Sequence, residues 1–149
     1  MDSSPEYRVE LLHGELTKSV IGAFYVVYNE LRYGFLEAIY VEALARLLRR
    51  KGHNVVWEAS ANVYFQGEVI GVQRLDLIVD GKLIIEVKST HDLSPSAHRQ
   101  LLSYLRGTGV ELGLLLHFGP EAKFYRTICS PRPAAKVPDS LKTESAGFD

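Results

Sequence analysis

Residues 74–88 read RLDLIVDGKLIIEVK, and the strongest fold signal in the chain lies here. Both halves are rich in Leu, Ile and Val, and Asp80-Gly81 between them is typical of the tight turn of a β-hairpin. Three ionisable residues interrupt this apolar context: Asp76, Glu86 and Lys88. Because alternate side chains of a strand share a face, Glu86 and Lys88 point the same way, and Asp76 on the paired strand can reach that face. Such groups are costly to bury, which indicates a purpose.

The purpose that the hairpin favours is the binding of a divalent metal ion. Hard ions such as Mg²⁺ take oxygen ligands, commonly one or two carboxylates with water and substrate phosphates. A lysine beside such a site can stabilise the negative charge that develops on a phosphate group. The alternative is a solvent-exposed strand edge on which Glu86 and Lys88 form an ordinary ion pair, and the hairpin alone does not decide between the two.

Composition limits the classes of protein to consider. The chain has 149 residues, 46% hydrophobic and 23% charged, with a formal net charge of −1. This is the size of one soluble domain. The chain has no overall positive charge to attract nucleic acid, so any positively charged surface that binds nucleic acid must be local. The single Cys129 excludes a disulfide framework and a cysteine-rich metal cluster. We find no signal-peptide pattern and no apolar run of membrane-spanning length, so we expect a cytoplasmic protein without a membrane partner.

The spacing of apolar residues predicts helices first, then strands, then a helix and two further strands. The expected elements are helices over 15–31 and 36–51, strands over 54–59 and 61–65, the hairpin, a helix that starts at Ser94-Pro95 and stops at Gly107 or Gly109, and strands over 111–118 and 122–129. This order predicts an α/β domain, a mixed central β-sheet flanked by helices. We expect a loosely ordered N-terminus over 1–14, a single domain over 15–129 and a disordered C-terminal tail over 130–149, which is poor in apolar anchors.

Two helices carry polar residues that could serve the same site. Glu37 falls in the first turn of the second helix, where an acidic residue also interacts well with the helix dipole. Gln100 and Tyr104 lie one turn apart on one face of the third helix, where they could equally form a solvated polar stripe. Each residue alone has this ordinary explanation.

Together the motifs resemble a known family. Gly34-x-x-Glu37-x-x-Tyr40, Arg74-x-Asp76, Glu86-x-Lys88 and Gln100-x-x-x-Tyr104 occur in the order and spacing of the GxxExxY family. These are small bacterial and archaeal proteins grouped within the PD-(D/E)xK nuclease superfamily. The resemblance covers residues 16–129 and implies a restriction-endonuclease-like core. The Gln-x-x-x-Tyr motif is also similar to that of RecB-type nucleases.

The resemblance implies roles for particular residues. It implies four ligands for a Mg²⁺ or Mn²⁺ ion: Glu37, Asp76, Glu86 and the carbonyl of Val87. It implies a catalytic lysine and two residues that support the site or the substrate: Lys88, Gln100 and Tyr104. The expected function is that of a metal-dependent nuclease, an enzyme that hydrolyses phosphodiester bonds of DNA or RNA.

Two other hypotheses stay open. The near-neutral charge favours a catalytically inactive module with the same fold that binds nucleic acid or a protein partner. Val26 favours it too, because the family often carries an acidic residue near this position in the first helix. The third hypothesis is a homo-oligomer whose composite surface supplies the basic groove that one chain lacks.

Overall fold

A computed structural model describes residues 5–130 of the chain, and their side chains from residue 13 onward. The helical and strand segments follow one another in the predicted order, as three helices and five strands: α1 (Pro5–Leu31), α2 (Glu37–Arg50), β1 (Val55–Phe65), β2 (Glu68–Val79), β3 (Leu83–Lys88), α3 (Pro95–Thr108), β4 (Leu112–Phe118) and β5 (Ala122–Ile128). The predicted α/β architecture with a mixed sheet is confirmed.

Element boundaries differ from the predictions at two places. α1 begins at Pro5 rather than at residue 15, and non-helical backbone at His13 separates the added turns from the rest of the helix. β1 is one continuous strand where two short strands were predicted. The predicted disorder over 130–149 lies outside the described residues, apart from Ser130.

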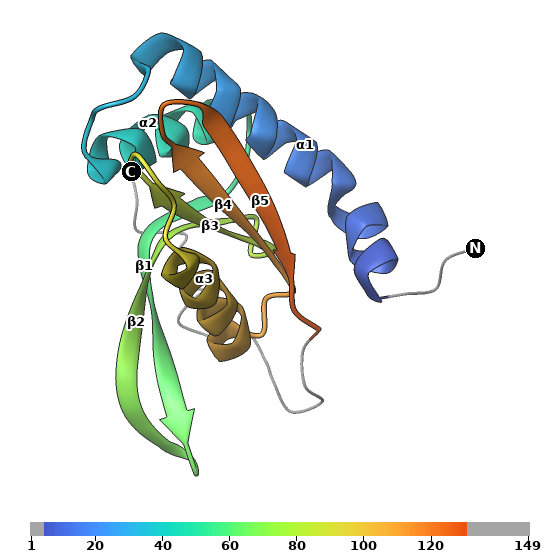
Figure 1. The fold of residues 1–149 in the computed structure, drawn as a ribbon. Helices are drawn as coiled ribbons and strands as arrows, with labels where there is room; N and C mark the ends of the chain where they lie inside the picture. Colours follow the sequence, from blue (N-terminus) through green and yellow to red (C-terminus); the bar gives the residue numbers. More distant parts are fainter. Residues whose placement is uncertain (1–4, 131–149) are drawn as a thin grey trace.

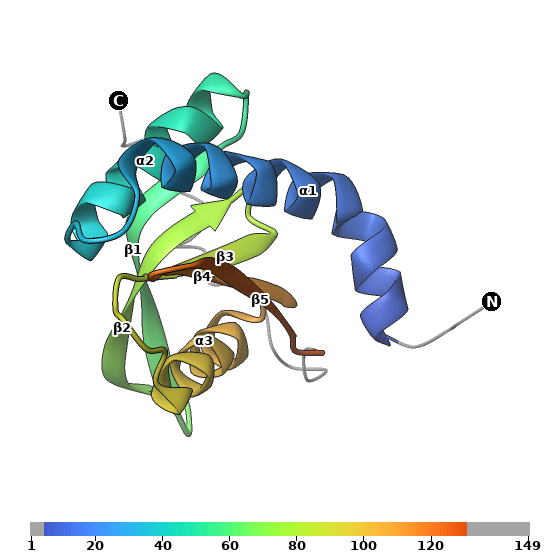
Figure 2. The same cartoon turned by 45° about the horizontal axis from the view of Figure 1, so that its top comes forward.

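The five strands form one sheet in the order β1-β2-β3-β4-β5. β3 and β4 run parallel, and the other neighbouring strands are antiparallel. A parallel pair needs a crossover connection, which α3 provides. In Figures 1 and 2, α1 and α2 cover one face of the sheet and α3 covers the other.

The hairpin turn between β2 and β3 has the predicted chemistry. Asp80 and Gly81 both have positive φ, 54° and 66°, which is the requirement of a type I′ turn. The N–H of Lys82 donates to the carbonyl of Val79 at 3.0 Å and closes the turn. The Asp80 carboxylate accepts the N–H of Asn54 at 2.8 Å, so the turn is also fastened to the start of β1.

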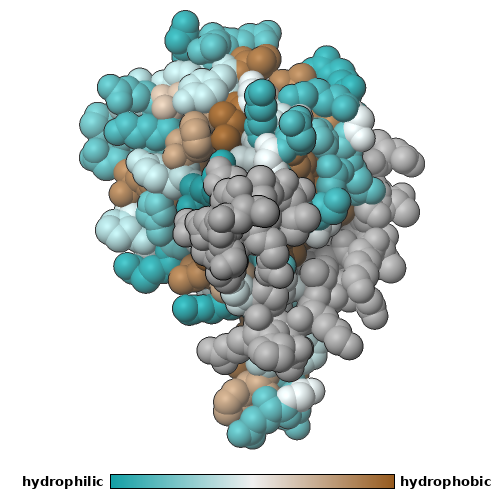
Figure 3. All heavy atoms as spheres, turned by 90° about the vertical axis from the view of Figure 1, so that its right-hand side faces the viewer, coloured by the Kyte–Doolittle hydropathy of each residue, from teal (hydrophilic) through white to brown (hydrophobic). Residues whose placement is uncertain are grey.

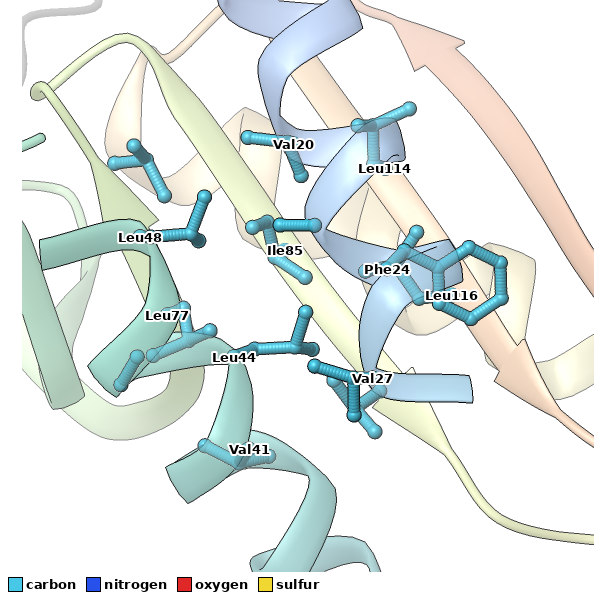
Figure 4. Packing of buried hydrophobic residues seen from close by; sticks show 14 of the residues in the cluster. Val20, Phe24, Val27, Val41, Leu44, Leu48, Leu77, Ile85, Leu114 and Leu116 are labelled. Atoms are coloured by element: carbon cyan, nitrogen blue, oxygen red, sulfur yellow. The ribbon is translucent and has the colours of Figure 1, made fainter. Parts of the chain in front are cut away.

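Two apolar cores lie on opposite faces of the sheet. The larger core packs α1 and α2 against the sheet and includes Phe24, Leu44 and Ile85 (Figure 4). The smaller core packs α3 against the other face and includes Leu101 and Ile84. β3 is therefore buried on both sides, and its five residues from Leu83 to Val87 are all buried. Any ionisable side chain on this strand lies in an apolar environment.

β2 pairs with the rest of the sheet only at its C-terminal end. It pairs with β3 only over Leu77–Val79, whereas it pairs with β1 along its whole length. The end of the β1–β2 hairpin, residues 60–74, therefore projects from the sheet as a two-stranded ribbon, which we call the arm (Figure 1). The hairpin twists where the arm starts, since Leu77 belongs to the α1/α2 core while Leu75 belongs to the α3 core.

The link between α1 and α2 is held by Tyr40. Its ring is fully buried and stacks on Phe118 with the ring centroids 4.0 Å apart. Its hydroxyl donates to the carbonyl of Arg32 and accepts the N–H of Phe35 at 3.1 Å. Gly34 in the same link has a φ of 123°, which favours glycine. The Gly34-x-x-Glu37-x-x-Tyr40 motif thus shapes the link and sets where Glu37 begins α2.

α3 starts and ends at the predicted signals. Ser94 is the N-cap, with its hydroxyl oxygen accepting the N–H of Ser96 at 3.2 Å, and Pro95 occupies the first helical position. Gly109 ends the helix in the left-handed conformation, and its N–H donates to the carbonyl of Leu105 at 2.9 Å. None of the described helices has the length and apolar character needed to cross a membrane.

Candidate functional site

The candidate site lies at the fork where β2 separates from β3. The last paired residues are Leu77 and Ile85, so Asp76 and Glu86 face each other at the first open position. The Asp76 carboxylate accepts the N–H of Val87 at 2.8 Å. A side chain thus takes the hydrogen bond that the neighbouring strand would accept in a continuing ladder. This bond holds the Asp76 carboxylate on β3.

Glu86 points toward α3 and is almost completely buried, with 4% of its surface exposed. One carboxylate oxygen, Oε1, lies 3.5 Å from the Lys88 ammonium. The other, Oε2, is buried without a hydrogen-bond partner among the residues that the structure describes. A buried carboxylate oxygen without a donor is unfavourable, and a cation or a proton would satisfy it.

Burial shifts the pKa values of both carboxyl groups. It raises the pKa of Glu86 to about 8, with the negative charge of Asp76 acting in the same direction and the charge of Lys88 opposing it. Burial also raises the pKa of Asp76, against the hydrogen bond from Val87. The positive charge of Lys88 lowers the pKa of both groups, but the effect of burial is larger. Near pH 7, without a cation, we therefore expect the pair to share one proton.

α3 supplies two of the predicted residues. The Lys88 ammonium donates to the amide oxygen of Gln100 at 3.0 Å. Tyr104 is buried, with 6% of its surface exposed, and burial raises the pKa of its hydroxyl to about 12. The negative charges of Glu86 and Asp76 add to this shift, so the ring lies beside the carboxyl pair. Tyr104 is therefore no part of a solvated stripe, and Gln100 holds the Lys88 ammonium.

Glu37 approaches the site from the other side of the sheet. Its carboxylate accepts the N–H of Ser89, one residue beyond Lys88, at 3.4 Å. The Ser89 hydroxyl donates in turn to the carbonyl of Phe35 in the α1–α2 link. Across residues 13–130, whose side chains the structure describes, there is no group of three or more His, Cys, Asp and Glu side chains close enough to hold one ion together. In this structure Glu37 is thus anchored at the end of β3, apart from the carboxyl pair.

A pocket adjoins this end of β3. It has a volume of about 430 Å³ and is lined by Tyr33, Gly34, Phe35, Leu36, Glu37 and Ser89. The rings of Tyr33 and Phe35 are 41% and 45% exposed. Exposed rings are the surface on which unstacked nucleobases pack.

Glu58 is a neighbour of the site that sequence reasoning missed. Trp57 pairs with Leu77 and Ala59 with Leu75, so Glu58 lies across from Asp76 on β1. Its φ of 53° is unusual for a residue with a side chain, and its charge adds to the rise in the pKa of Asp76. The residue falls within a predicted strand. Its position became apparent only from the register of the hairpin, which periodicity does not give.

The fold and the site define a class of protein. A mixed sheet covered by helices, with an acidic residue at a strand fork facing a Glu-x-Lys motif on the next strand, is the arrangement of restriction-endonuclease-like nucleases. The sequence model of the PD-(D/E)XK nuclease superfamily matches residues 14–127, and the chain belongs to this superfamily. Nucleases of this superfamily generally use divalent metal ions.

Comparison with solved structures agrees on the fold. The crystal structure of SSO0001 aligns with a TM-score of 0.50 and 20% sequence identity, over 94% of this chain and 68% of that chain. At this identity the likeness concerns the fold alone. No curated protein matches the sequence significantly.

The residues at the fork fit a divalent metal ion. Asp76 and Glu86 offer carboxylate oxygens, which are the ligands that hard cations prefer. The unsatisfied Oε2 of Glu86 is the atom at which a cation would relieve a buried charge. A water-rich coordination shell suits two protein carboxylates, because Mg²⁺ commonly keeps several waters.

Proposed function

We propose that this protein is a Mg²⁺- or Mn²⁺-dependent nuclease that hydrolyses phosphodiester bonds of DNA or RNA. The observation that carries the proposal is the carboxyl pair of Asp76 and Glu86, with its buried unsatisfied oxygen, next to an ammonium that α3 holds in place. Asp76, Glu86 and the carbonyl of Val87 would hold the ion. Membership in the PD-(D/E)XK superfamily supports this reading.

A bound Mg²⁺ or Mn²⁺ ion supplies a Lewis acid that polarises the phosphoryl oxygen and acidifies the attacking water. Lys88 provides a second positive charge. Gln100 at 3.0 Å and Glu86 at 3.5 Å restrain its ammonium, so the charge is positioned before the substrate arrives. A preorganised charge stabilises a phosphate whose negative charge grows in the transition state. Gln100 is on this account a positioning residue.

Glu37 and Tyr104 have supporting roles in the proposal. Glu37 fixes the backbone of Ser89 and so the direction in which β3 ends after Lys88, and a water could bridge its carboxylate to the ion. Tyr104 closes the α3 side of the site and excludes water from the carboxyl pair. The exposed rings of the adjoining pocket would receive a nucleobase next to the scissile phosphate.

The test is a digestion panel of single- and double-stranded DNA and RNA with Mg²⁺, Mn²⁺ or EDTA. We expect metal-dependent cleavage by the wild type, and loss of cleavage by Lys88→Ala and Asp76→Asn. Matched controls are Lys82→Ala and Asp92→Asn, which change exposed residues outside the site and should leave cleavage intact. Undiminished metal-dependent cleavage by Lys88→Ala would refute the assigned role.

A second candidate function is a catalytically inactive module that binds nucleic acid or a protein partner. The observation that favours it is that no third acidic or histidine side chain joins the carboxyl pair in the described part of the chain. Calorimetric titration with Mn²⁺ separates the two candidates. Binding that Asp76→Asn abolishes supports the nuclease, whereas no heat of binding at millimolar Mn²⁺ supports the module.

The finer assignment to the GxxExxY family is also a proposal. It is supported by the role of Tyr40, whose hydroxyl bonds to both ends of the α1–α2 link and so places Glu37 next to β3. In a family with this motif, the Gly, Glu and Tyr would then act as one unit that brings an acid to the end of the central strand.

A further inference from the structure

The arm presents an apolar face to solvent. Cross-strand pairs share a face, and Tyr64 pairs with Val69 while Asn62 pairs with Val72. Tyr64, Val69 and Val72 are 57%, 52% and 61% exposed. Phe65 and Ile70 at the tip are exposed to 60% and 66%. Figure 3 shows the arm as the projection at the bottom of the molecule, with apolar residues at its surface.

The opposite face of the arm is covered at its base. Ala61 and its cross-strand partner Gln73 point toward α3, where Ala61 is buried and Gln73 donates to the Ser103 hydroxyl at 3.0 Å. The arm is therefore fixed to the body of the protein at its base. The exposed apolar face of the arm is therefore held in a defined orientation relative to the body of the protein.

The arm also carries a strand edge without a neighbour. Beyond Leu77, β2 has no partner on its β3 side among the described strands, so residues 68–75 have a free edge. Free edges of this length invite pairing with another strand. An arm of one copy can thus add both backbone hydrogen bonds and apolar side chains to an arm of another.

The charge of the arm argues against nucleic acid as its partner. Residues 60–74 of the arm contain two charged side chains, Glu68 and Arg74, and Arg74 is their only cation. Proteins that hold a nucleic-acid backbone do so with Lys and Arg. Arg74 at the base and Glu68 near the tip instead stand at opposite ends of the free edge. Antiparallel pairing of two such edges brings Glu68 of one copy toward Arg74 of the other, which is a complementary arrangement.

The available area matches a modest dimer. On the face with Tyr64, Val69 and Val72 every residue is more than half exposed, and Tyr64 alone offers on the order of 100 Å². Val69 and Val72 add a similar amount, so the apolar side chains of two arms offer on the order of 400 Å². The backbone hydrogen bonds of the paired edges add to this contact, which lies at the weak end of specific interfaces.

We propose that the arm is a dimerisation element that binds the arm of a second copy of this chain. The two β2 edges pair antiparallel about a two-fold axis, which joins the two arms into one four-stranded sheet and places Tyr64, Val69 and Val72 of both copies side by side on one face. A symmetric contact of this kind closes on itself and does not propagate into a fibre.

Sedimentation velocity tests the proposal on the full chain, from about 1 µM to about 200 µM, the range over which an interface of this size dissociates. We expect the mass to rise with concentration from one chain to two. Val72→Lys should weaken the dimer about tenfold or more, because two lysines then meet near the axis. Ile70→Lys provides a second test at another exposed position of the arm.

Val26→Lys is the matched control. It is the same substitution at a valine of α1 that is 53% exposed, away from the arm, and it should leave the dimer unchanged. Circular dichroism of each variant checks that the chain is folded. A wild-type chain of single mass at every concentration would overturn the proposal, as would equal dissociation by Val26→Lys and Val72→Lys.

Discussion

Glu86→Gln should stabilise the metal-free protein at alkaline pH. Glu86 is 4% exposed, its pKa is raised from 4.5 to about 8, and in the unfolded chain the same group ionises near its ordinary value. As pH rises from about 4.5 to about 8, Glu86 ionises in the unfolded state of the wild type, whereas in the folded state it stays mostly protonated. The free energy of unfolding of the wild type therefore falls over this range.

The size of the effect follows from the shift. Each pKa unit is worth about 1.4 kcal/mol, so a rise from 4.5 to about 8 corresponds to roughly 5 kcal/mol when Glu86 is fully ionised. Gln cannot ionise, and its neutral amide has the size and the hydrogen-bonding capacity of a protonated carboxyl group. We expect the variant to match the wild type near pH 4.5 and to exceed it by several kcal/mol at pH 9.

Urea denaturation in EDTA at the two pH values, followed by circular dichroism, measures the difference. Glu42→Gln is the control, because this carboxylate is exposed and pairs with Arg46 on the surface of α2. Its effect should be small and nearly independent of pH. If Glu86→Gln changed the free energy of unfolding equally at both pH values, the buried, shifted carboxyl that underlies the proposed metal site would be refuted.

Three further predictions concern the metal, the lysine and the link. Binding of Mn²⁺ at pH 7 should release close to one proton, because the ion replaces the proton shared by the carboxyl pair. The affinity of the protein for Mn²⁺ should therefore rise with pH up to about 8. Calorimetry in buffers of different ionisation enthalpy measures both the proton release and the affinity. Gln100→Ala should lower cleavage about tenfold by freeing the Lys88 ammonium, and Gln100→Glu, which keeps an acceptor at the same place, should restore much of it in the same assay. Tyr40→Phe should lower the free energy of unfolding by about 1–3 kcal/mol in a urea titration, because the carbonyl of Arg32 and the N–H of Phe35 lose their partner; an unchanged midpoint would contradict that role.

Local signals in the sequence predicted most of the fold. Asp80-Gly81, Ser94-Pro95 and Gly109 each impose a backbone conformation through their own chemistry, and the structure has the turn, the helix start and the helix end at these residues. Periodicity predicted the order of the elements, because the core lies on one face of each helix. It could not predict the length of α1.

The site was predictable in its residue types but not in its geometry. Alternation places Glu86 and Lys88 on one face, yet the burial of Tyr104 beside them depends on how α3 packs, which no local pattern encodes. The position of Glu58 depends on hairpin register, and that of Glu37 on the path of the α1–α2 link. The arm was not predicted because its residues read as ordinary strands. The arm exists because β3 pairs with only the last three residues of β2, and this pairing depends on how the whole sheet is arranged.

The hydrogen bond from the Val87 N–H to the Asp76 carboxylate gives this side chain a structural role in addition to its proposed role as a metal ligand. Replacing Asp76 by an aliphatic residue would remove a hydrogen-bond acceptor from the central strand as well as a proposed ligand of the ion. A loss of cleavage in such a variant could not be separated from local unfolding. Asparagine keeps the acceptor and discards the charge. In related chains that lack the proposed cleavage activity, we therefore expect an amide or hydroxyl side chain at position 76. Such a side chain would keep the hydrogen bond from Val87 and the shape of the fork without the negative charge.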